Sequence, residues 1–161
     1  IRSGDLEALN RVEREQSSLL STPFGKSISD SIMFGFRNAS PSAVAALGRI
    51  GSAKSSSNDL KTACAGALAA MHTKDALPYL ASFLDSTDLT QRTFAVGGLA
   101  MFANNVPIGR HEPASGNWKY RTDDTITHSA MDTQLIGKNE SFYVGFWKAW
   151  WATHRAELSG Q

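Results

Sequence analysis

Two short segments in the middle of the chain are variants of one another, and this internal repeat constrains the fold more than any other feature. The segments KTACAGALAAM (Lys61–Met71) and RTFAVGGLAMF (Arg92–Phe102) share a basic residue, a threonine, a glycine and a leucine at matching places. The copies are offset by about 31 residues, a period typical of stacked helical repeats. A chain with such a repeat is expected to stack its units rather than fold around a sheet.

Each copy is predicted to be an α-helix, because small and apolar residues recur along one helical face. In the first copy this face comprises Leu60, Ala63, Cys64, Ala67, Leu68 and Met71, and in the second Phe94, Ala95, Gly98, Leu99 and Phe102. Dense glycine and alanine lower helix propensity but let neighbouring backbones approach closely. A second apolar run precedes each copy, at 43–50 and 76–83, so each unit is predicted to be a pair of helices.

Start signals agree with helix pairs. Asp75 is a candidate cap for the helix after it, Asp88 with Gln91 makes a variant capping box, and Asn58 or Asp59 is expected to cap the earlier unit. The sequence predicts helices near the following ranges: 5–20, 27–38, 41–50, 59–72, 75–85, 89–103, 124–136 and 140–158.

The helix pairs resemble HEAT-like or armadillo-like repeats, with AVAALGRIGS before the first copy and DALPYLASFLDSTD before the second. Asp88 and Arg92 stand where such repeats often carry an Asp between helices and an Arg early in the second helix. The resemblance is clearest over 40–104, with atypical ends at 1–39 and 124–161. It implies one all-α domain spanning the chain, an α-α superhelix (a right-handed solenoid of HEAT-like helix pairs) that usually binds other macromolecules.

The last predicted helix carries an aromatic band, SFYVGFWKAWW, which holds three of the four tryptophans. Terminal repeats lack a neighbour and must close the core themselves, and large aromatics suit that role. We therefore expect Trp147 and Trp151 to be buried, with Trp150 or Tyr143 at the rim. The alternative is a band that grips a ligand or partner.

The long segment 104–124 has no helical periodicity, and loops of this length are often functional. Its candidate partner-binding residues can hydrogen-bond, stack or carry positive charge: Arg110, His111, Trp118, Tyr120 and Arg121. In the alternative interpretation, the segment is an insertion whose aromatic residues pack back onto the helices.

Catalytic and cofactor chemistry has little support in the sequence, so no cofactor and no enzymatic activity are expected. His111-Glu112 resembles the pairs of HEAT-like di-iron hydroxylases, but those enzymes need several pairs and this chain has one. His72, His128 and His154 lack the spaced partners of a metal-ligand set. The lone Cys64 sits among alanines, where a thiol behaves as a small hydrophobic group.

Charge and composition narrow the partners. Sixteen basic and 15 acidic side chains give a formal charge of +1, so no strong field would gather nucleic acid or an anionic membrane. No apolar run approaches the roughly 20 residues of a membrane span. The start without methionine and the serine-rich segments favour an exported or periplasmic bacterial protein, with a cytoplasmic location still open.

These observations favour a non-enzymatic helical-repeat protein that binds a protein or peptide, through a groove lined by the second helices and through the 104–124 segment. The alternative is a nucleic-acid-binding or base-processing (glycosylase-like) helical-repeat protein. A third possibility is a structural fragment of a longer solenoid. Salt dependence separates the first two, because phosphate binding weakens by orders of magnitude with added salt.

Overall fold

The described part of the chain is helical throughout and contains no strand. The computed structural model describes residues 6–20, 31–32, 40–104 and 137–158. Its helices, in chain order, are α1 (Leu6–Leu20), α3 (Pro41–Ser52), α4 (Asn58–Ala70), the short 3-10 turn η1 (Lys74–Ala76), α5 (Leu77–Phe83), α6 (Leu89–Ala103) and α9 (Glu140–Leu158). In this part, no helix is both long and apolar enough to cross a membrane.

The predicted helices 5–20, 41–50, 59–72, 89–103 and 140–158 are confirmed to within a few residues. The predicted helix 75–85 is divided into η1 and α5, and Pro78 lies in the first turn of α5, where a proline needs no hydrogen-bond partner. The predicted helix 124–136 lies outside the described residues. So does the predicted helix 27–38, except for positions 31–32.

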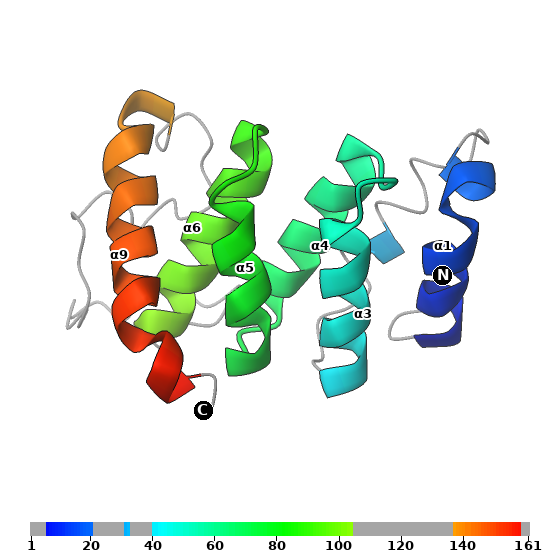
Figure 1. Ribbon diagram of the computed structural model, residues 1–161, viewed down its shortest axis with the longest axis horizontal. Helices are drawn as coiled ribbons and strands as arrows, with labels where there is room; N and C mark the ends of the chain where they lie inside the picture. Colours follow the sequence, from blue (N-terminus) through cyan, green and yellow to red (C-terminus); the bar gives the residue numbers. More distant parts are fainter. Residues whose placement is uncertain (1–5, 21–30, 33–39, 105–136, 159–161) are drawn as a thin grey trace.

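The helices stand side by side along the molecule, from α1 at one end to α9 at the other (Figure 1). In that view α3 and α5 lie in front, with α4 and α6 behind them. Helix α3 packs on α4, α5 packs on α6, and α4 packs directly on α6. Helix α9 packs on both α5 and α6.

Small residues let these helices approach closely. A Cβ added to Gly98 of α6 would lie 2.9 Å from the Cα of Ala69 in α4, and one added to Gly51 of α3 would lie 2.7 Å from the ring of Phe83 in α5. As the repeat predicts, Gly97 and Gly98 lie inside a buried helix rather than in a turn. Helix α6 has no exposed residue, and α4 exposes only Asn58 and Asp59.

The helix caps differ in part from those expected. Asp88 caps α6 as predicted, its Oδ1 accepting from the backbone N–H of Thr90 at 2.8 Å and of Gln91 at 3.1 Å. Helix α4 is capped by Ser57, not by Asn58 or Asp59, because the chain turns helical one residue earlier than expected. No side chain caps η1 or α5; Asp75 lies within the 3-10 turn and cannot act as its cap.

The aromatic band of α9 is mainly core, as expected, but its buried members differ. Trp147 is fully buried, and Tyr143 and Trp150 are also buried, whereas Trp151 is only partly so. The prediction that Trp151 is buried and that Trp150 or Tyr143 lies at the rim was therefore wrong. The face turned toward α5 and α6 runs through positions 143, 147, 150 and 154, one helical stripe that leaves Trp151 on its flank. The Trp147 and Trp150 rings meet edge to face, with centroids 5.4 Å apart.

Candidate functional site

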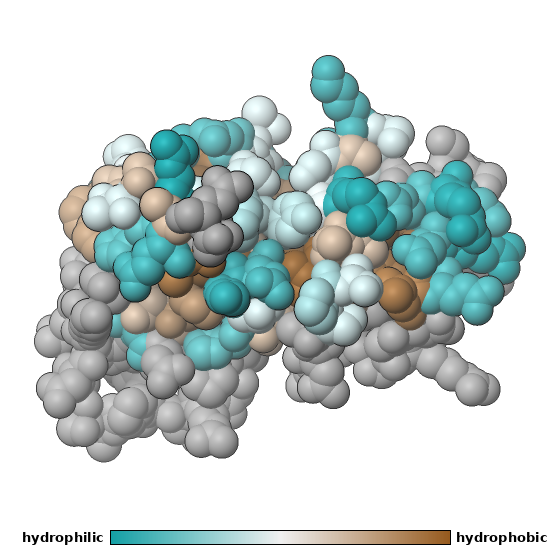
Figure 2. Space-filling view, turned by 60° about the horizontal axis from the view of Figure 1, so that its bottom comes forward, coloured by the Kyte–Doolittle hydropathy of each residue, from teal (hydrophilic) through white to brown (hydrophobic). Residues whose placement is uncertain are grey.

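The five residues singled out between 104 and 124 are Arg110, His111, Trp118, Tyr120 and Arg121, and they lie outside the described residues. Along the second helices, where a groove was expected, no residue of α6 is more than partly exposed, and in α4 only Asn58 and Asp59 are exposed. On the face shown in Figure 2, hydrophobic residues show between hydrophilic ones rather than forming one broad apolar patch. The most distinctive accessible feature is instead a polar pocket between the two helix pairs.

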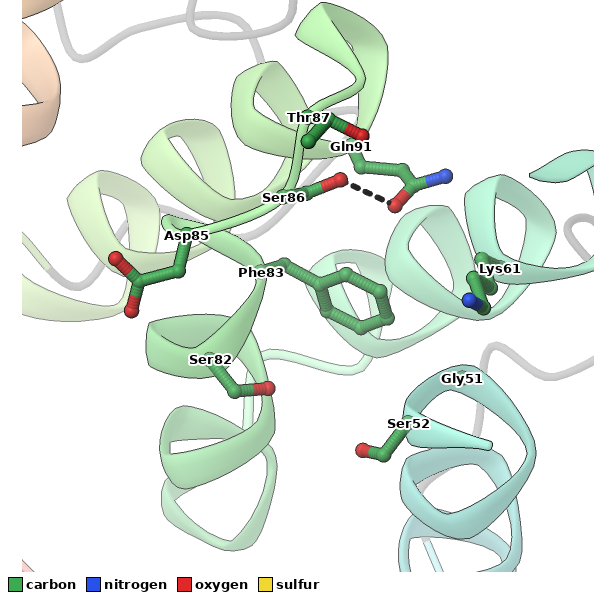
Figure 3. Close-up of a pocket in the computed structure, with 9 residues that line it drawn as sticks. All are labelled: Gly51, Ser52, Lys61, Ser82, Phe83, Asp85, Ser86, Thr87 and Gln91. Carbon is green, nitrogen blue, oxygen red and sulfur yellow. Dashed lines mark hydrogen bonds between the residues drawn. The ribbon is translucent and has the colours of Figure 1, made fainter. Parts of the chain in front are cut away.

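This interpair pocket encloses about 350 Å³ and lies where α3, α4, α5 and the start of α6 meet. Figure 3 shows its lining residues, which are Gly51, Ser52, Lys61, Ser82, Phe83, Asp85, Ser86, Thr87 and Gln91. Its volume lies at the lower end of the range of roughly 300–1,000 Å³ for small-ligand pockets. Its lining carries four hydroxyl groups, the Lys61 ammonium group, the Asp85 carboxylate and the Gln91 amide beside the Phe83 ring, so it offers hydrogen-bonding groups next to an apolar wall.

The apolar wall of the pocket is the ring of Phe83, which is 5% exposed. Gly51 makes room for it, because a Cβ at this position would lie 2.7 Å from the ring's Cζ and 3.2 Å from the Cβ of Cys64. Phe83 belongs to α5, whereas Gly51 and Cys64 belong to α3 and α4. The wall is thus fixed by contacts among three helices.

Another part of the lining is a hydrogen-bond network centred on Gln91, which is 2% exposed. Its amide nitrogen lies 2.8 Å from Asn58 Oδ1 and 3.1 Å from Thr62 Oγ1, and its Oε1 accepts from Ser86 Oγ at 2.7 Å. Ser86 Oγ in turn accepts from the backbone N–H of Asp88. The sequence suggested that Gln91 closes the capping box directly, but Ser86 Oγ lies between the Gln91 side chain and the backbone N–H of Asp88. The Gln91 amide nitrogen instead links α6 to the start of α4.

Asp88 is an ionised structural cap rather than an acid or base. Burial raises the pKa of its carboxyl, but hydrogen bonds from Asn58 Nδ2 and from the backbone N–H groups of Gln91 and Thr90, with the charge of Arg92, lower it. The net pKa lies below the ordinary value for aspartate. With its oxygens already accepting three hydrogen bonds, this carboxylate is occupied by the fold.

The pocket's hydrogen-bonding groups differ in whether the fold already uses them. Ser52 Oγ donates to Gly48 O at 2.7 Å, and Ser82 Oγ donates to Tyr79 O at 2.6 Å, so both hydroxyls can only accept from a ligand.

Two side-chain donors remain free, because the Lys61 ammonium group and the Thr87 hydroxyl make no hydrogen bond or ion pair within the part of the chain that the structure describes. The Asp85 carboxylate points away from the other lining groups in Figure 3 and pairs with Lys148 of α9.

Catalytic and metal chemistry finds no support among the described residues. No group of three or more His, Cys, Asp or Glu side chains in those residues is arranged to hold a metal ion. Cys64 is fully buried, and burial raises the pKa of its thiol well above the ordinary value, so the nucleophilic thiolate is not formed near neutral pH. His72 lies just after the end of α4 at a positive φ of 49°, with Nε2 3.2 Å from Met101 O, which is a structural role.

The pocket was not anticipated from the sequence, although one signal pointed to it. Lys61 and Arg92 occupy equivalent places in the two copies of the repeat. The serines and the threonine that line the pocket come from two segments, GS at 51–52 and the run from 82 to 87, whose proximity depends on how the pairs stack. No family model matches this chain, and no curated protein or solved structure is significantly similar to it.

Proposed function

We propose that this chain is a non-enzymatic helical-repeat scaffold, a right-handed solenoid of HEAT-like helix pairs, that binds a protein or peptide. The observation that carries the proposal is the interpair pocket, whose walls are fixed by four helices while Lys61 and Thr87 keep unused donors. A rigid site with unused hydrogen-bonding groups binds a partner at low entropic cost.

The internal repeat supports the solenoid part of this proposal. The matching segments Lys61–Met71 and Arg92–Phe102 fall in α4 and α6, and these two helices pack directly on one another. Each is preceded by a helix that packs on it, α3 in the first pair and α5 in the second. Stacked pairs of this kind bury a continuous core and place the junctions between pairs at the surface.

The segment 104–124 is the second element of the proposed binding surface. It follows α6 and supplies aromatic and arginine side chains, the residue types that dominate interface energy. The proposed contact residues here remain Arg110, His111, Trp118, Tyr120 and Arg121.

The proposal is tested by selecting short peptides from a random display library against the whole chain and measuring their affinities by fluorescence anisotropy. Three variants divide the surface: Lys61→Met in the pocket, the triple change Arg110→Ala with Trp118→Ala and Arg121→Ala in the segment, and Lys74→Met as a charge-matched control. Lys74 is exposed and lies beyond the C-terminal end of α4. The pocket lies at the other end of α4, near its first residue, Asn58.

We expect selected peptides to lose affinity with the pocket variant, the segment variant or both, and to keep it with Lys74→Met. Selection of no peptide, or equal affinity for all four proteins, would reject the proposal. Binding of a single-stranded oligonucleotide that falls by orders of magnitude between low and moderate salt would favour the nucleic-acid function instead.

A further inference from the structure

The two copies of the repeat place a basic residue at the same position, and the structure shows different surroundings for the two side chains. Lys61 lies in the second turn of α4, and Arg92 lies at the equivalent place in α6. Both side chains are partly buried. Comparing them shows what this position binds when a partner is present.

Arg92 is held by two groups of its own chain. Its NH1 group donates to the backbone carbonyl of Ser86 at 2.5 Å, and its guanidinium pairs with the carboxylate of Glu140 at the start of α9, the helix stacked next along the molecule. The Arg92 Nε–H is close to Glu140 without being aligned for a hydrogen bond. The Arg92 side chain is 16% exposed and that of Glu140 is 32% exposed, so the ion pair is partly shielded from water.

Lys61 has no such partner in the described residues, and it borders the interpair pocket. The helix stacked next on α4 is α6, whose first turn contributes Gln91, a neutral side chain already held by Ser86, Asn58 and Thr62. The first pair therefore presents a cation and an open pocket where the second pair presents a cation and a carboxylate.

We propose that the interpair pocket binds a carboxylate carried by a peptide, with Lys61 contacting that group as Arg92 contacts Glu140. This inference rests on the proposed peptide-binding function and names the chemistry that its pocket recognises. A charge-assisted hydrogen bond from an ammonium group to a carboxylate is about twice as strong as a neutral one.

The other lining groups fit the same ligand. Thr87 supplies a second free donor for the carboxylate oxygens, and the Ser52 and Ser82 hydroxyls, whose own hydrogens bond backbone carbonyls, can accept from a neighbouring peptide N–H. The Phe83 ring provides an apolar surface for methylene groups.

The nearby acidic groups already have partners. Asp85 points out of the pocket and pairs with Lys148, and Asp88 accepts hydrogen bonds from Asn58 and from the start of α6. Lys61 therefore supplies the positive charge that faces the cavity.

Nuclear magnetic resonance titration of the whole ¹⁵N-labelled chain tests the inference. Three small probes separate the sources of the carboxylate: N-acetylglutamic acid α-methylamide for a side chain, N-acetylglycine for a chain terminus, and N-acetylglutamine α-methylamide as the neutral isostere. The protein variants are Lys61→Met, Lys61→Arg and the control Lys74→Met, each checked for an unchanged dispersion of backbone signals.

We expect one of the carboxylate probes to shift the amide signals of pocket residues such as Ser86 and Thr87, and the glutamine probe to bind at least tenfold more weakly. Lys61→Met should weaken carboxylate binding at least tenfold, whereas Lys61→Arg and Lys74→Met should retain it. Equal binding of the neutral and charged probes, or no effect of Lys61→Met, would overturn the inference.

The outcome is distinguishable from failure of the proposed function. If display-selected peptides bind while neither carboxylate probe shifts the pocket signals, the carboxylate inference is wrong and the peptide-binding proposal stands. If the carboxylate probes bind at Lys61 but no peptide is selected, the pocket serves a small acid and the peptide-binding proposal is wrong.

Discussion

The same substitution, glycine to alanine, should have different effects on the unfolding free energy at two helical positions of this chain. At Gly98 in α6, an added Cβ would lie 2.8 Å from Leu80 Cδ1, 2.9 Å from Ala69 Cα and 3.0 Å from Ala69 Cβ. The leucine can rotate, but the Ala69 backbone belongs to α4 and can yield only if the two helices separate. Such overpacking of a core costs about 1–3 kcal/mol of unfolding free energy.

Gly145 in α9 is the matched control, because an added Cβ there meets nothing within 4 Å. Replacing glycine by alanine in an exposed helix interior stabilises a protein by roughly 1 kcal/mol, since alanine loses less backbone entropy on folding. The same propensity gain applies at Gly98, so it cancels in the comparison. We therefore expect Gly98→Ala to be less stable than Gly145→Ala by about 1–3 kcal/mol, the overpacking cost alone.

Urea unfolding followed by circular dichroism at the helical minimum measures both free energies. For a domain of this size, 1 kcal/mol corresponds to a shift in melting temperature of about 2–4 °C, so thermal unfolding gives an independent reading. Gly145→Ala should unfold at higher urea than the natural chain, and Gly98→Ala at lower urea than Gly145→Ala. Equal stabilisation by both substitutions would show that α4 and α6 do not approach as closely as described, and the packing argument would fail.

Three further predictions concern single interactions. Asp88→Ala should lower the unfolding free energy by about 1 kcal/mol, because it removes the α6 cap. The pKa of Asp88 is lowered in the folded protein, so its contribution to stability is present above the unfolded pKa of about 3.9 and is lost as pH falls through the folded pKa. Urea unfolding at a series of acidic pH values should therefore show a weaker pH dependence of the unfolding free energy for Asp88→Asn than for the natural chain. Cys64 should resist a thiol reagent in the folded protein at mildly alkaline pH and react on unfolding in urea, whereas rapid native labelling would contradict its burial. Glu140→Gln should lower the unfolding free energy by roughly 1–2 kcal/mol, and a double-mutant cycle with Arg92→Met should show coupling; purely additive effects would mean that the pair contributes nothing.

The sequence predicted the helices well because each has a periodic face and most have a recognisable start. Asp88, a side chain that accepts from backbone N–H groups, was identified as the cap of α6 because such residues are common at this position. Ser57 was missed because Asn58 and Asp59, which follow it directly, are equally good caps by type. Only the backbone geometry selects among three neighbouring polar residues.

The burial pattern of α9 was harder to predict, because aromatic residues occupy nearly half of its helical circumference. Periodicity alone places Tyr143, Trp147, Trp150 and Trp151 on one broad face and does not fix where that face is centred. The contacts with α5 and α6 centre it between Trp147 and Trp150, so Trp151 moves to the flank. A helix with a narrower apolar stripe would have left no such freedom.

The interpair pocket could not be predicted because it depends on residues brought together from both helix pairs. Ser52 and Ser82 are distant in sequence, and neither belongs to a recognisable motif. The repeat did align Lys61 with Arg92, but equivalence in sequence does not reveal that one cation has a carboxylate partner and the other faces a cavity.

That difference between equivalent positions is also what links the packing of the protein to its proposed function. The small residues of α4 and α6 bring these two helices close together, and the side chains between them are buried. At the junctions between pairs, Arg92 already binds Glu140 and Lys61 borders an open pocket. A substitution that pairs Lys61 internally, Gln91→Glu, should therefore weaken carboxylate binding in the titration described above, because a negative charge from α6 would then compete for Lys61. Undiminished binding by that variant would place the carboxylate elsewhere on the molecule.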